Sequence, residues 1–393
     1  MRPEAQPEAL LADPVFAGPQ VTRFPDRSYG RARDIVAFKF GGSSLLGAER
    51  MANAASLVRE AATKSSVVVV VSAMKGVTDR LLGIARALRT GRGNDALRAA
   101  EHLLYIHFDV LRELRLDPFA AERVARDLRL LGKDLFHDVR EDARAAALSD
   151  EALHDRLASY GERFSARLFA ATLEKLGQLA VPVSSSEFVL TCDTFRDAEP
   201  HVEETRRRGR EILLPLFADG VVPVVTGFIG STADGRVTTL GRNSSDFSGA
   251  LVAHVVDANE LVIWTDVDGI YTANPREDAE ARLLHELSYD QARALAAAGA
   301  KVLHAKVLPL AAETEIVVWV RNTFNPLERG TRIGPSALAS LCVGAPAVTR
   351  SERSECVSAD QRSGGVSPAV VGSNNSIVAA PRGCHNSNSR GAA

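Results

Sequence analysis

The segment Val67-Val68-Val69-Val70-Val71, followed at once by Ser72-Ala73-Met74-Lys75-Gly76, indicates the fold class of this chain. A continuous apolar run of this length is typical of a strand that is buried on both faces of a parallel sheet. Working outward, further strands are predicted at 35–40, 221–225, 260–265 and 316–321, and helices at 48–62, 78–89, 94–148 with a break at Pro118, 162–176, 249–256 and 289–298. Strands that alternate with helices predict an α/β fold, with an open, mostly parallel sheet covered by helices on both faces.

The composition is that of an ordinary globular protein, with 46% hydrophobic and 24% charged residues. The 393 residues include 47 Lys+Arg and 49 Asp+Glu, so the near-neutral charge does not support nucleic-acid binding. No apolar run exceeds five residues, so no membrane span is expected. Proline and acidic residues stand where a secretory signal would need an apolar stretch, and we expect a cytoplasmic protein. The four cysteines have no CxxC spacing and predict neither a metal site nor a disulfide framework.

Two segments differ from the rest of the chain in composition. Residues 1–33 hold five prolines and no periodic pattern, so they are predicted to form a flexible leader. Residues 335–393 contain no aromatic residue and are rich in Ser, Gly, Ala and Asn, which predicts a low-complexity tail that cannot offset its ordering entropy. Residues 34–334 are therefore predicted to form the folded unit.

The first candidate site is Lys39-Phe40-Gly41-Gly42-Ser43-Ser44, where a strand runs into two glycines and two hydroxyls. Glycines let the backbone approach an anion closely, and exposed N–H groups can then cradle a phosphate. The pattern is neither a Walker A motif nor GxGxxG. A tight strand–helix turn with a snorkelling lysine explains the same residues, so this motif alone leaves both interpretations open.

Two further loops carry hydroxyl or acidic residues. Ser72 to Asp79 follows the valine strand, and Thr78 or Asp79 explains it equally well as a helix cap. Glu162 stands near the start of the predicted helix 162–176, where a carboxylate favours the helix dipole but could also bind an ammonium group.

The most informative stretch runs from Thr238 to Ala250 and contains Arg242, Ser244, Ser245 and Asp246. The arginine offers a bidentate fork for a carboxylate, the serines suit an anion, and the aspartate could orient a lysine. A serine-capped helix explains the serines but not the arginine in the turn. Later in the chain, 264–276 combines aromatic, acidic and arginine residues that suit a nucleotide, and 299–304 presents another lysine.

Taken in order, the motifs KFGGSS, SAMKGVTD, GERFSA, TLGRNSSDFSGALVA, IWTDVDGIYTANPR and GAKVLHAKVLPLA resemble those of aspartokinases in the amino-acid kinase family. The resemblance covers Val36 to Ile333, and the segment from Val320 onward looks most like the kinase half of bifunctional aspartokinase/homoserine dehydrogenases. It implies an αβα sandwich of the carbamate kinase-like type, with L-aspartate on the N-terminal lobe and Mg-ATP on the C-terminal lobe. The sequence does not give the oligomeric state, and a homo-oligomer is one assembly compatible with it.

The resemblance further implies residue roles and a reaction. The catalytic residues would be Lys39, Asp246 and Lys301, and aspartate would contact Ser72, Thr78, Glu162, Arg242 and Ser245. ATP would contact Lys39, Gly41, Gly42, Ser43, Thr265, Asp266, Tyr271, Arg276, Lys301 and Val302. With ATP and Mg²⁺ as cofactors, the product would be 4-phospho-L-aspartate, the first intermediate towards lysine, threonine and methionine. No side chain is implied as a metal ligand.

The sequence departs from the family pattern at several positions. Ser43 replaces threonine, Phe247 replaces tyrosine, Asn274 replaces aspartate and Ser244 replaces glycine. A positive φ at Ser244 would strain the turn by about 1 kcal/mol. No regulatory (ACT) domain pattern follows residue 334. Two alternatives therefore stay open: a catalytically silent amino-acid-binding subunit, and a kinase acting on glutamate or N-acetylglutamate.

Overall fold

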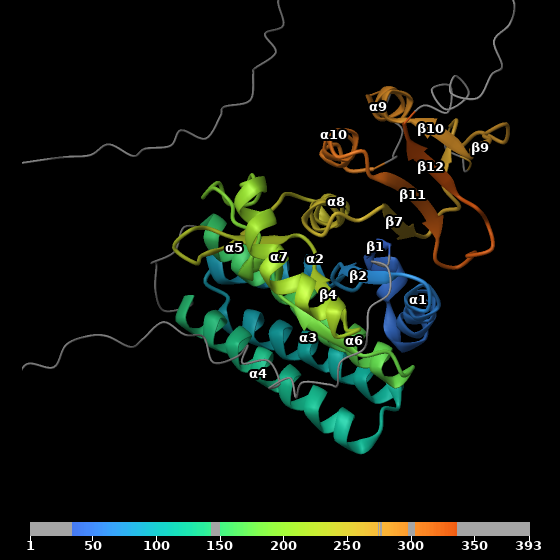
Figure 1. Ribbon diagram of the computed structural model, residues 1–393. Coiled ribbons are helices and arrows are strands. Elements are labelled where there is room, and N and C mark those ends of the chain that lie inside the picture. Colours follow the sequence, from blue (N-terminus) through green and yellow to red (C-terminus); the bar gives the residue numbers. More distant parts are fainter. Residues whose placement is uncertain (1–33, 143–149, 274, 276, 298–302, 336–393) are drawn as a thin grey trace, which may run out of the picture. The chain divides into compact units, whose positions relative to one another are not determined.

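The computed structural model describes residues 34–142, 150–273, 275, 277–297 and 303–335 (Figure 1). The predicted leader, and the predicted tail beyond Pro335, lie outside the described residues, as do Arg276, Lys301 and Val302 of the predicted nucleotide contacts.

The central element is an eight-stranded sheet in the order β10-β12-β11-β7-β1-β2-β4-β3. Its strands are β1 (Ile35–Phe40), β2 (Ser66–Val71), β3 (Ala180–Val183), β4 (Val222–Thr226), β7 (Glu260–Thr265), β10 (Glu286–Ser288), β11 (Val317–Asn322) and β12 (Thr331–Gly334). Neighbouring strands are parallel except β11 and β12, which are antiparallel. The predicted open, mostly parallel sheet is confirmed.

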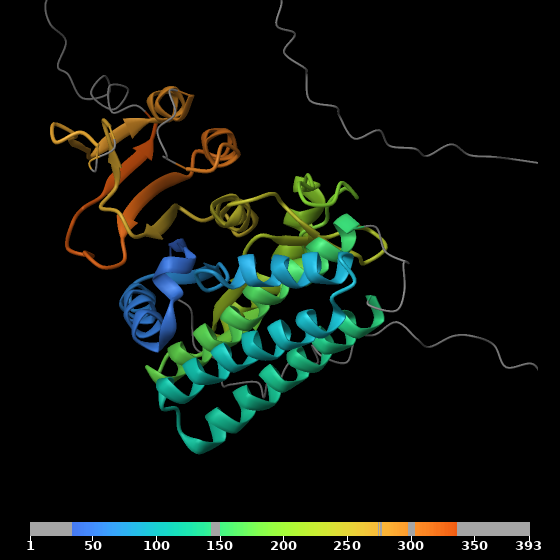
Figure 2. The same ribbon diagram turned by 180° about the vertical axis from the view of Figure 1, so that it is seen from behind.

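Helices cover both faces of this sheet, because alternate strand residues point in opposite directions. Val67, Val69 and Val71 pack in one hydrophobic core, whereas Val68 and Val70 pack in the other. The first core includes α1 (Gly47–Ala62), α2 (Val77–Arg89), α3 (Gly93–Leu114), α4 (Pro118–Asp142), α5 (Asp150–Ala158) and α6 (Tyr160–Lys175). The second includes α7 (Val202–Ala218), α8 (Ser245–Val255), α9 (Tyr289–Ala297) and α10 (Val307–Glu313). Figures 1 and 2 show α3 and α4 on one side of the sheet and α8 and α10 on the other.

Most predicted elements agree closely with the structure. The long helical segment is divided near Pro118, which begins α4, and the Asp117 side chain accepts hydrogen bonds from the N–H groups of Phe119 and Ala120 at 3.0 Å each. Helix α8 begins at Ser245, four residues before the predicted start. Sequence reasoning missed β3, β10, β12, α5, α7, α10 and the short strands β5 (Ile229–Ser231), β8 (Ile270–Tyr271) and β9 (Leu283–Leu284). Strand β6 (Val237–Thr239), which precedes Arg242, pairs with β5 in a separate two-stranded sheet.

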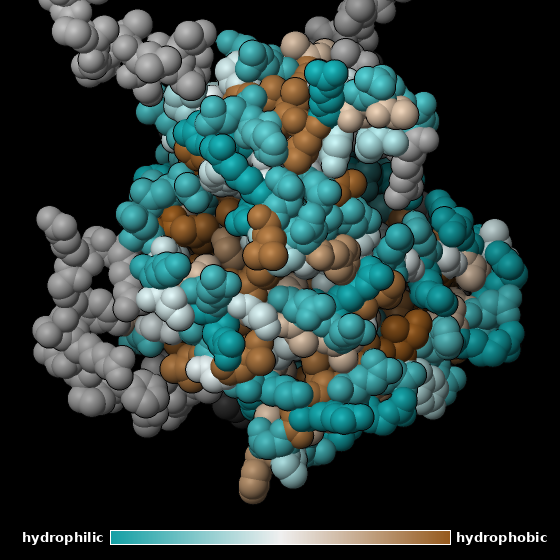
Figure 3. Space-filling view, turned by 90° about the vertical axis from the view of Figure 1, so that its right-hand side faces the viewer, coloured by the Kyte–Doolittle hydropathy of each residue, from teal (hydrophilic) through white to brown (hydrophobic). Residues whose placement is uncertain are grey.

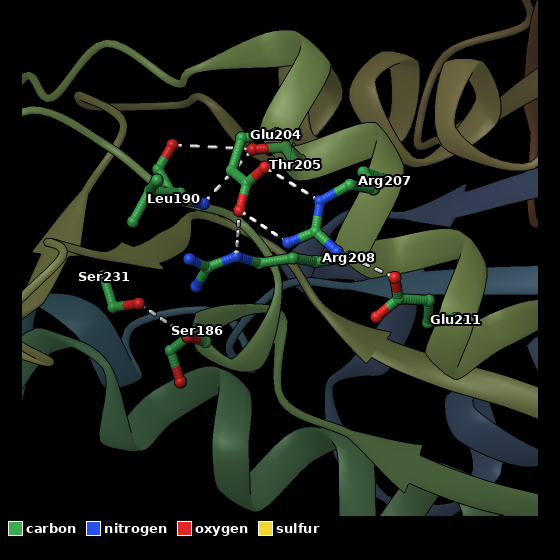
Figure 4. A network of polar contacts seen from close by, with 8 residues as sticks. All are labelled: Ser186, Leu190, Glu204, Thr205, Arg207, Arg208, Glu211 and Ser231. Carbon is green, nitrogen blue, oxygen red and sulfur yellow. Dashed lines mark hydrogen bonds and ion pairs between the residues drawn. The ribbon is translucent and has the colours of Figure 1, made fainter.

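Two acidic residues of α7 pair with arginines of the same helix, whereas Arg206 and Arg210 pair with Asp257 after α8. Glu204 accepts hydrogen bonds from Arg207 at 2.8 and 3.0 Å and from Arg208 at 2.7 Å, and Glu211 accepts another from Arg207 at 2.8 Å (Figure 4). Such exposed pairs contribute little to stability, but they neutralise the arginine run locally.

The molecular face in Figure 3 is largely hydrophilic, with hydrophobic residues in separate small groups. Among the described residues, the most exposed large apolar side chains are Leu327 and Phe119. No helix in the described part of the chain is long and apolar enough to cross a membrane.

Candidate active site

The site lies where the carboxyl ends of the parallel strands meet. The N–H of Ser72, after β2, donates to the Phe40 carbonyl at 3.1 Å, and the N–H of Gly41, after β1, donates to the Trp264 carbonyl of β7 at 3.3 Å. Strand β1 lies between β2 and β7, so later segments of the chain add strands to the sheet on both sides of β1. In open α/β sheets, ligands bind in the crevice at such a switch point.

A cavity of about 250 Å³ lies at this edge of the sheet. Its lining residues are Gly42, Ser72, Ala73, Met74, Lys75, Gly76, Thr78, Asp79, Leu82, His154, Glu162, Phe228, Arg242, Asn243, Ser244 and Ser245. The structure therefore brings all the predicted aspartate contacts together around one cavity, although they come from three separate segments of the chain.

Glu162 is the buried acid of this cavity. It lies in the first turn of α6 and is only 3% exposed. Its Oε1 accepts the N–H of Ala73 at 3.0 Å, and its Oε2 has no hydrogen-bond partner among the described residues. Desolvation raises the pKa of Glu162 to about 8, although the Ala73 N–H, the N–H of Glu162 itself and the charge of Lys39 act in the opposite direction. A cation bound at Oε2 would restore the ionised form.

Gly161 allows Glu162 to come this close to the loop after β2. A Cβ atom at position 161 would lie 2.6 Å from the Cβ of Ala73, which is closer than real Cβ atoms approach. The glycine therefore lets the first turn of α6 pack directly on the Ala73 loop, and the carboxylate of the next residue reaches the Ala73 N–H.

Lys39 and Asp246 form a largely buried ion pair beside the cavity. The Lys39 Nζ lies 2.5 Å from the Asp246 Oδ1, and their side chains are 8% and 21% exposed. Lys39 is near the end of β1, and Asp246 is in the first turn of α8. Gly249 lets α8 lie against β1, since a Cβ there would be 3.1 Å from the Cβ of Lys39. The aspartate predicted to position the lysine does contact it.

The turn before α8 does not have the positive φ at Ser244 that would strain a serine. Ser244 has φ −77°, so the serine is not strained there. The left-handed residues are Gly241, with φ +96°, and Asn243, with φ +62°. Asparagine tolerates this conformation better than most residues do. Ser244 is the N-cap residue of α8, where its carbonyl accepts the N–H of Ser248 at 2.8 Å, but its hydroxyl makes no capping hydrogen bond.

Arg242 and Ser245 face the cavity from this turn. The Ser72 hydroxyl donates to the Ser245 hydroxyl at 2.7 Å, which joins the loop after β2 to the start of α8. The Arg242 side chain is 82% exposed, and its guanidinium lies 3.7 Å from the carboxylate of Asp79. It is therefore available to a carboxylate that enters the cavity.

The glycine loop after β1 packs tightly against the loop after β2. The Lys75 N–H donates to the Gly42 carbonyl at 3.1 Å, and a Cβ at position 42 would lie 2.7 Å from the Ala73 carbonyl oxygen. A Cβ at Gly41 would lie 3.6 Å from the Lys39 Nζ, so a glycine keeps the approach to that ammonium open. Ser43 follows these glycines within the short 3₁₀ segment Gly42–Leu45.

Of the other described residues predicted to contact the nucleotide, Thr265 ends β7 and Asp266 and Tyr271 follow it, and none of the three lines the cavity. The Thr265 hydroxyl donates to the Asp266 carboxylate at 3.3 Å, and burial, assisted by the charge of Asp268, raises the pKa of Tyr271. Asp268 also accepts a hydrogen bond from the Asn322 side chain at 2.8 Å. Within the described residues, no group of three His, Cys, Asp or Glu side chains is placed to hold a metal ion.

The residues of the cavity wall that sequence reasoning missed include His154 on α5 and Phe228 after β4. Neither carries a local pattern, because an isolated histidine or phenylalanine is common on any helix or strand end. Their place in the cavity wall follows only from the packing of α5 and the β5–β6 hairpin against the cavity.

Comparisons with known proteins agree with this arrangement. The model of the amino acid kinase family matches residues 34–322. Lysine-sensitive aspartokinase 3 of Escherichia coli (strain K12) is 35% identical over 301 residues, which cover 76% of this chain and 64% of that protein. Bifunctional aspartokinase/homoserine dehydrogenase 1, chloroplastic, of Zea mays is 31% identical over 299 residues, with coverage of 75% and 32%.

Among solved structures, E. coli aspartokinase III in complex with aspartate and ADP superposes with a TM-score of 0.68 at 34% identity, covering 77% of this chain and 65% of that one. The chain thus spans about one third to two thirds of the length of these relatives. Monofunctional and bifunctional aspartokinases match at similar identity, and the predicted resemblance is confirmed. The family match over 34–322 and the shared fold establish that this chain belongs to the amino acid kinase family.

Proposed function

We propose that this chain transfers the γ-phosphoryl group of ATP to the β-carboxylate of L-aspartate, giving 4-phospho-L-aspartate and ADP. The observation that carries the proposal is the pairing, in one cavity, of a buried carboxylate lacking a partner at Oε2, Glu162, with an exposed guanidinium, Arg242. A free α-amino acid presents an ammonium and a carboxylate on one carbon, which matches these two charges. The solved relative that carries aspartate and ADP supports this choice of substrates.

The residues of the cavity suggest which group of the amino acid each of them would bind. Glu162 would hold the ammonium, Arg242 would hold the α-carboxylate, and the hydroxyls of Ser72, Thr78 and Ser245 would complete the cavity. The side chain of the amino acid then extends towards Gly42, where β1 ends and Lys39 is close. We assign aspartate to the N-terminal lobe and the nucleotide to the C-terminal lobe on this basis.

The chemistry needs positioning more than proton transfer. The β-carboxylate is ionised at neutral pH, so no general base is required. One of its oxygens would form a bond to the γ-phosphorus while the bond to the β–γ bridging oxygen breaks and ADP leaves. Lys39, held by Asp246, would neutralise charge that develops on the phosphoryl oxygens, and the open approach at Gly41 fits a phosphate there. Mg²⁺, carried mainly on the phosphates, would supply further charge neutralisation.

Two alternatives are less well supported. A silent binding subunit has no need for the buried Lys39–Asp246 pair, which lies outside the cavity lining. An N-acylated substrate carries no charge on its nitrogen, so it would leave Glu162 Oε2 without a cation. Cytoplasmic location, homo-oligomer formation and a role in lysine, threonine and methionine synthesis stay predictions.

The function is tested by trapping the acyl phosphate with hydroxylamine. The purified chain is incubated with ATP, Mg²⁺ and either aspartate, glutamate or N-acetylglutamate, and the hydroxamate is measured by its colour with iron. Hydroxamate from aspartate alone supports the proposal. Product from another acid alone, or from none, would contradict it and favour the corresponding alternative.

Aspartate binding is expected to depend on pH through Glu162. With a pKa of about 8, this carboxyl is mostly protonated at neutral pH in the free protein. A bound ammonium favours the ionised form, so the KM for aspartate should fall as pH rises from about 6 to 8, by up to about tenfold per unit, and level off above that. Initial rates with coupled ADP detection at constant ionic strength measure this. A KM that stays constant across the range would refute the assignment, whereas a Glu162→Gln variant should show a flat profile.

A further inference from the structure

Arg242 depends on its backbone for its position. Its side chain is 82% exposed and approaches the Asp79 carboxylate only at 3.7 Å, so side-chain contacts with described residues do little to fix it. Arg242 stands in the turn that follows β6, and Thr239 is the last residue of that strand. Whatever holds that turn therefore determines where the guanidinium meets a carboxylate.

A buried carboxylate on a different element anchors the turn. Asp155 belongs to α5 and is fully buried. Its Oδ2 accepts the N–H groups of Thr239 at 2.8 Å and Arg196 at 2.7 Å. Its Oδ1 accepts the Thr239 hydroxyl at 2.8 Å and lies 3.0 Å from the Nδ1 of His154, which lines the cavity. Asp155 stands in none of the sequence motifs described above.

Hydrogen bonds and close packing also fix the residues between Thr239 and Arg242. The Thr239 carbonyl accepts the N–H of Ala198 at 2.8 Å, and the Leu240 N–H donates to the Phe228 carbonyl at 2.9 Å. Gly241 has φ +96°, and a Cβ there would lie 2.7 Å from the Asp197 Oδ1. The 193–198 loop thus closes on the turn from one side, and Asp155 binds both that loop, through Arg196, and the turn, through Thr239.

We propose that Asp155 is a positioning residue of the amino-acid site: it holds the Thr239–Arg242 turn and thereby places Arg242 for the α-carboxylate. The role of Arg242 rests on the proposed function, whereas the anchoring of the turn does not. A carboxylate suits this position because its two oxygens accept four donors, whereas a neutral hydroxyl or amide accepts fewer. Loss of the anchor should move the guanidinium rather than remove it.

The first test compares Asp155→Ala with Asp155→Asn. The alanine variant should raise the KM for aspartate roughly 10- to 100-fold, because misplacement of a binding group by about 1 Å costs that much, and should leave the KM for ATP within about threefold. In the asparagine variant the amide oxygen can still accept both backbone N–H groups, so the KM should stay within about threefold of the original value. An unchanged KM for aspartate in Asp155→Ala would overturn the proposal.

A double-mutant cycle tests whether Asp155 acts through Arg242. In an Arg242→Ala background, the further change Asp155→Ala should add less than about threefold to the KM, since both changes remove the same interaction. Fully additive effects would overturn the proposal. Asp257→Asn is the matched structural control: its carboxylate accepts a hydrogen bond from the Arg206 side chain at 2.8 Å just after α8, at the end of that helix away from the turn. It should lower stability without raising the KM.

Amide hydrogen exchange gives a readout that does not depend on activity. The N–H groups of 239–244 should exchange faster in Asp155→Ala and remain protected in Asp155→Asn. If the wild-type protein forms no aspartyl hydroxamate, the proposed function fails, but exchange still decides whether Asp155 anchors the turn. If Asp155→Ala does not fold, Asp155→Ser replaces it, and unchanged exchange in that variant would overturn the proposal.

Discussion

Replacing Lys39 with alanine is expected to lower turnover by about 10³-fold while the KM for aspartate changes by less than about threefold, because a preorganised charge at a reacting phosphoryl group acts mainly in the transition state. The geometry supports this separation. Lys39 pairs with Asp246 at 2.5 Å and is absent from the lining of the cavity that Glu162 and Arg242 share. Steady-state rates over a matrix of ATP and aspartate concentrations separate the two parameters.

Two further variants make the Lys39 result interpretable. Lys39→Met keeps most of the stem that packs near Gly249 and should lose as much turnover as alanine does. Lys64→Ala removes an exposed lysine just after α1 and should change neither parameter. Thermal unfolding of each variant shows whether the fold is retained. Undiminished turnover in Lys39→Met would remove Lys39 from the catalytic residues.

Replacing Glu162 with glutamine is expected to raise the KM for aspartate by about 10²-fold, with a smaller effect on turnover, because truncating one member of a buried charge pair costs a few kcal/mol of binding. The amide oxygen can still accept the Ala73 N–H, which Oε1 accepts at 3.0 Å, so the loop after β2 should keep its place. What changes is the charge available to the substrate ammonium at Oε2.

The chain offers a matched control for this charge removal. Glu174 lies near the other end of the same helix, α6, and pairs with Arg123 on the molecular surface. Glu174→Gln therefore makes the same chemical change away from the cavity and should leave the KM for aspartate unaltered. Equal KM values for Glu162→Gln and the unmodified chain would exclude Glu162 as the ammonium contact.

The fold was predictable where local pattern and tertiary role coincide. Val67–Val71 is apolar throughout because α-helices cover it on both sides, so the sequence alone indicates a central strand. Helix α7 was not predictable in this way, since it contains Gly209 and Pro215 and begins with a charged run. Gly209 is explained only by packing: a Cβ there would lie 2.6 Å from Val255 and 2.9 Å from Phe188.

Prediction of the site residues is limited in the same way, because local patterns do not reveal residues that act through tertiary contacts. Lys39, Glu162 and Arg242 stand in dense local motifs, and each was predicted from its own stretch of sequence. Asp155 was not, because its four donors come from its neighbour His154 and two distant loops, and a single aspartate in a helix has no local signature. Sequence alone left open whether Ser244 has a positive φ, and the structure places the left-handed backbone one residue earlier, at Asn243.

The central place of β1 also has a consequence for how the chain is made. Its partner β2 follows within about 30 residues, but β7, its other neighbour, begins only at Glu260. At about 5–20 residues per second, a ribosome needs roughly 10–45 s to reach that strand. During this time one edge of β1 has unpaired N–H and C=O groups, which can template pairing with another nascent chain. The strand that carries Lys39 is thus also the place where an unfinished chain is most exposed to aggregation.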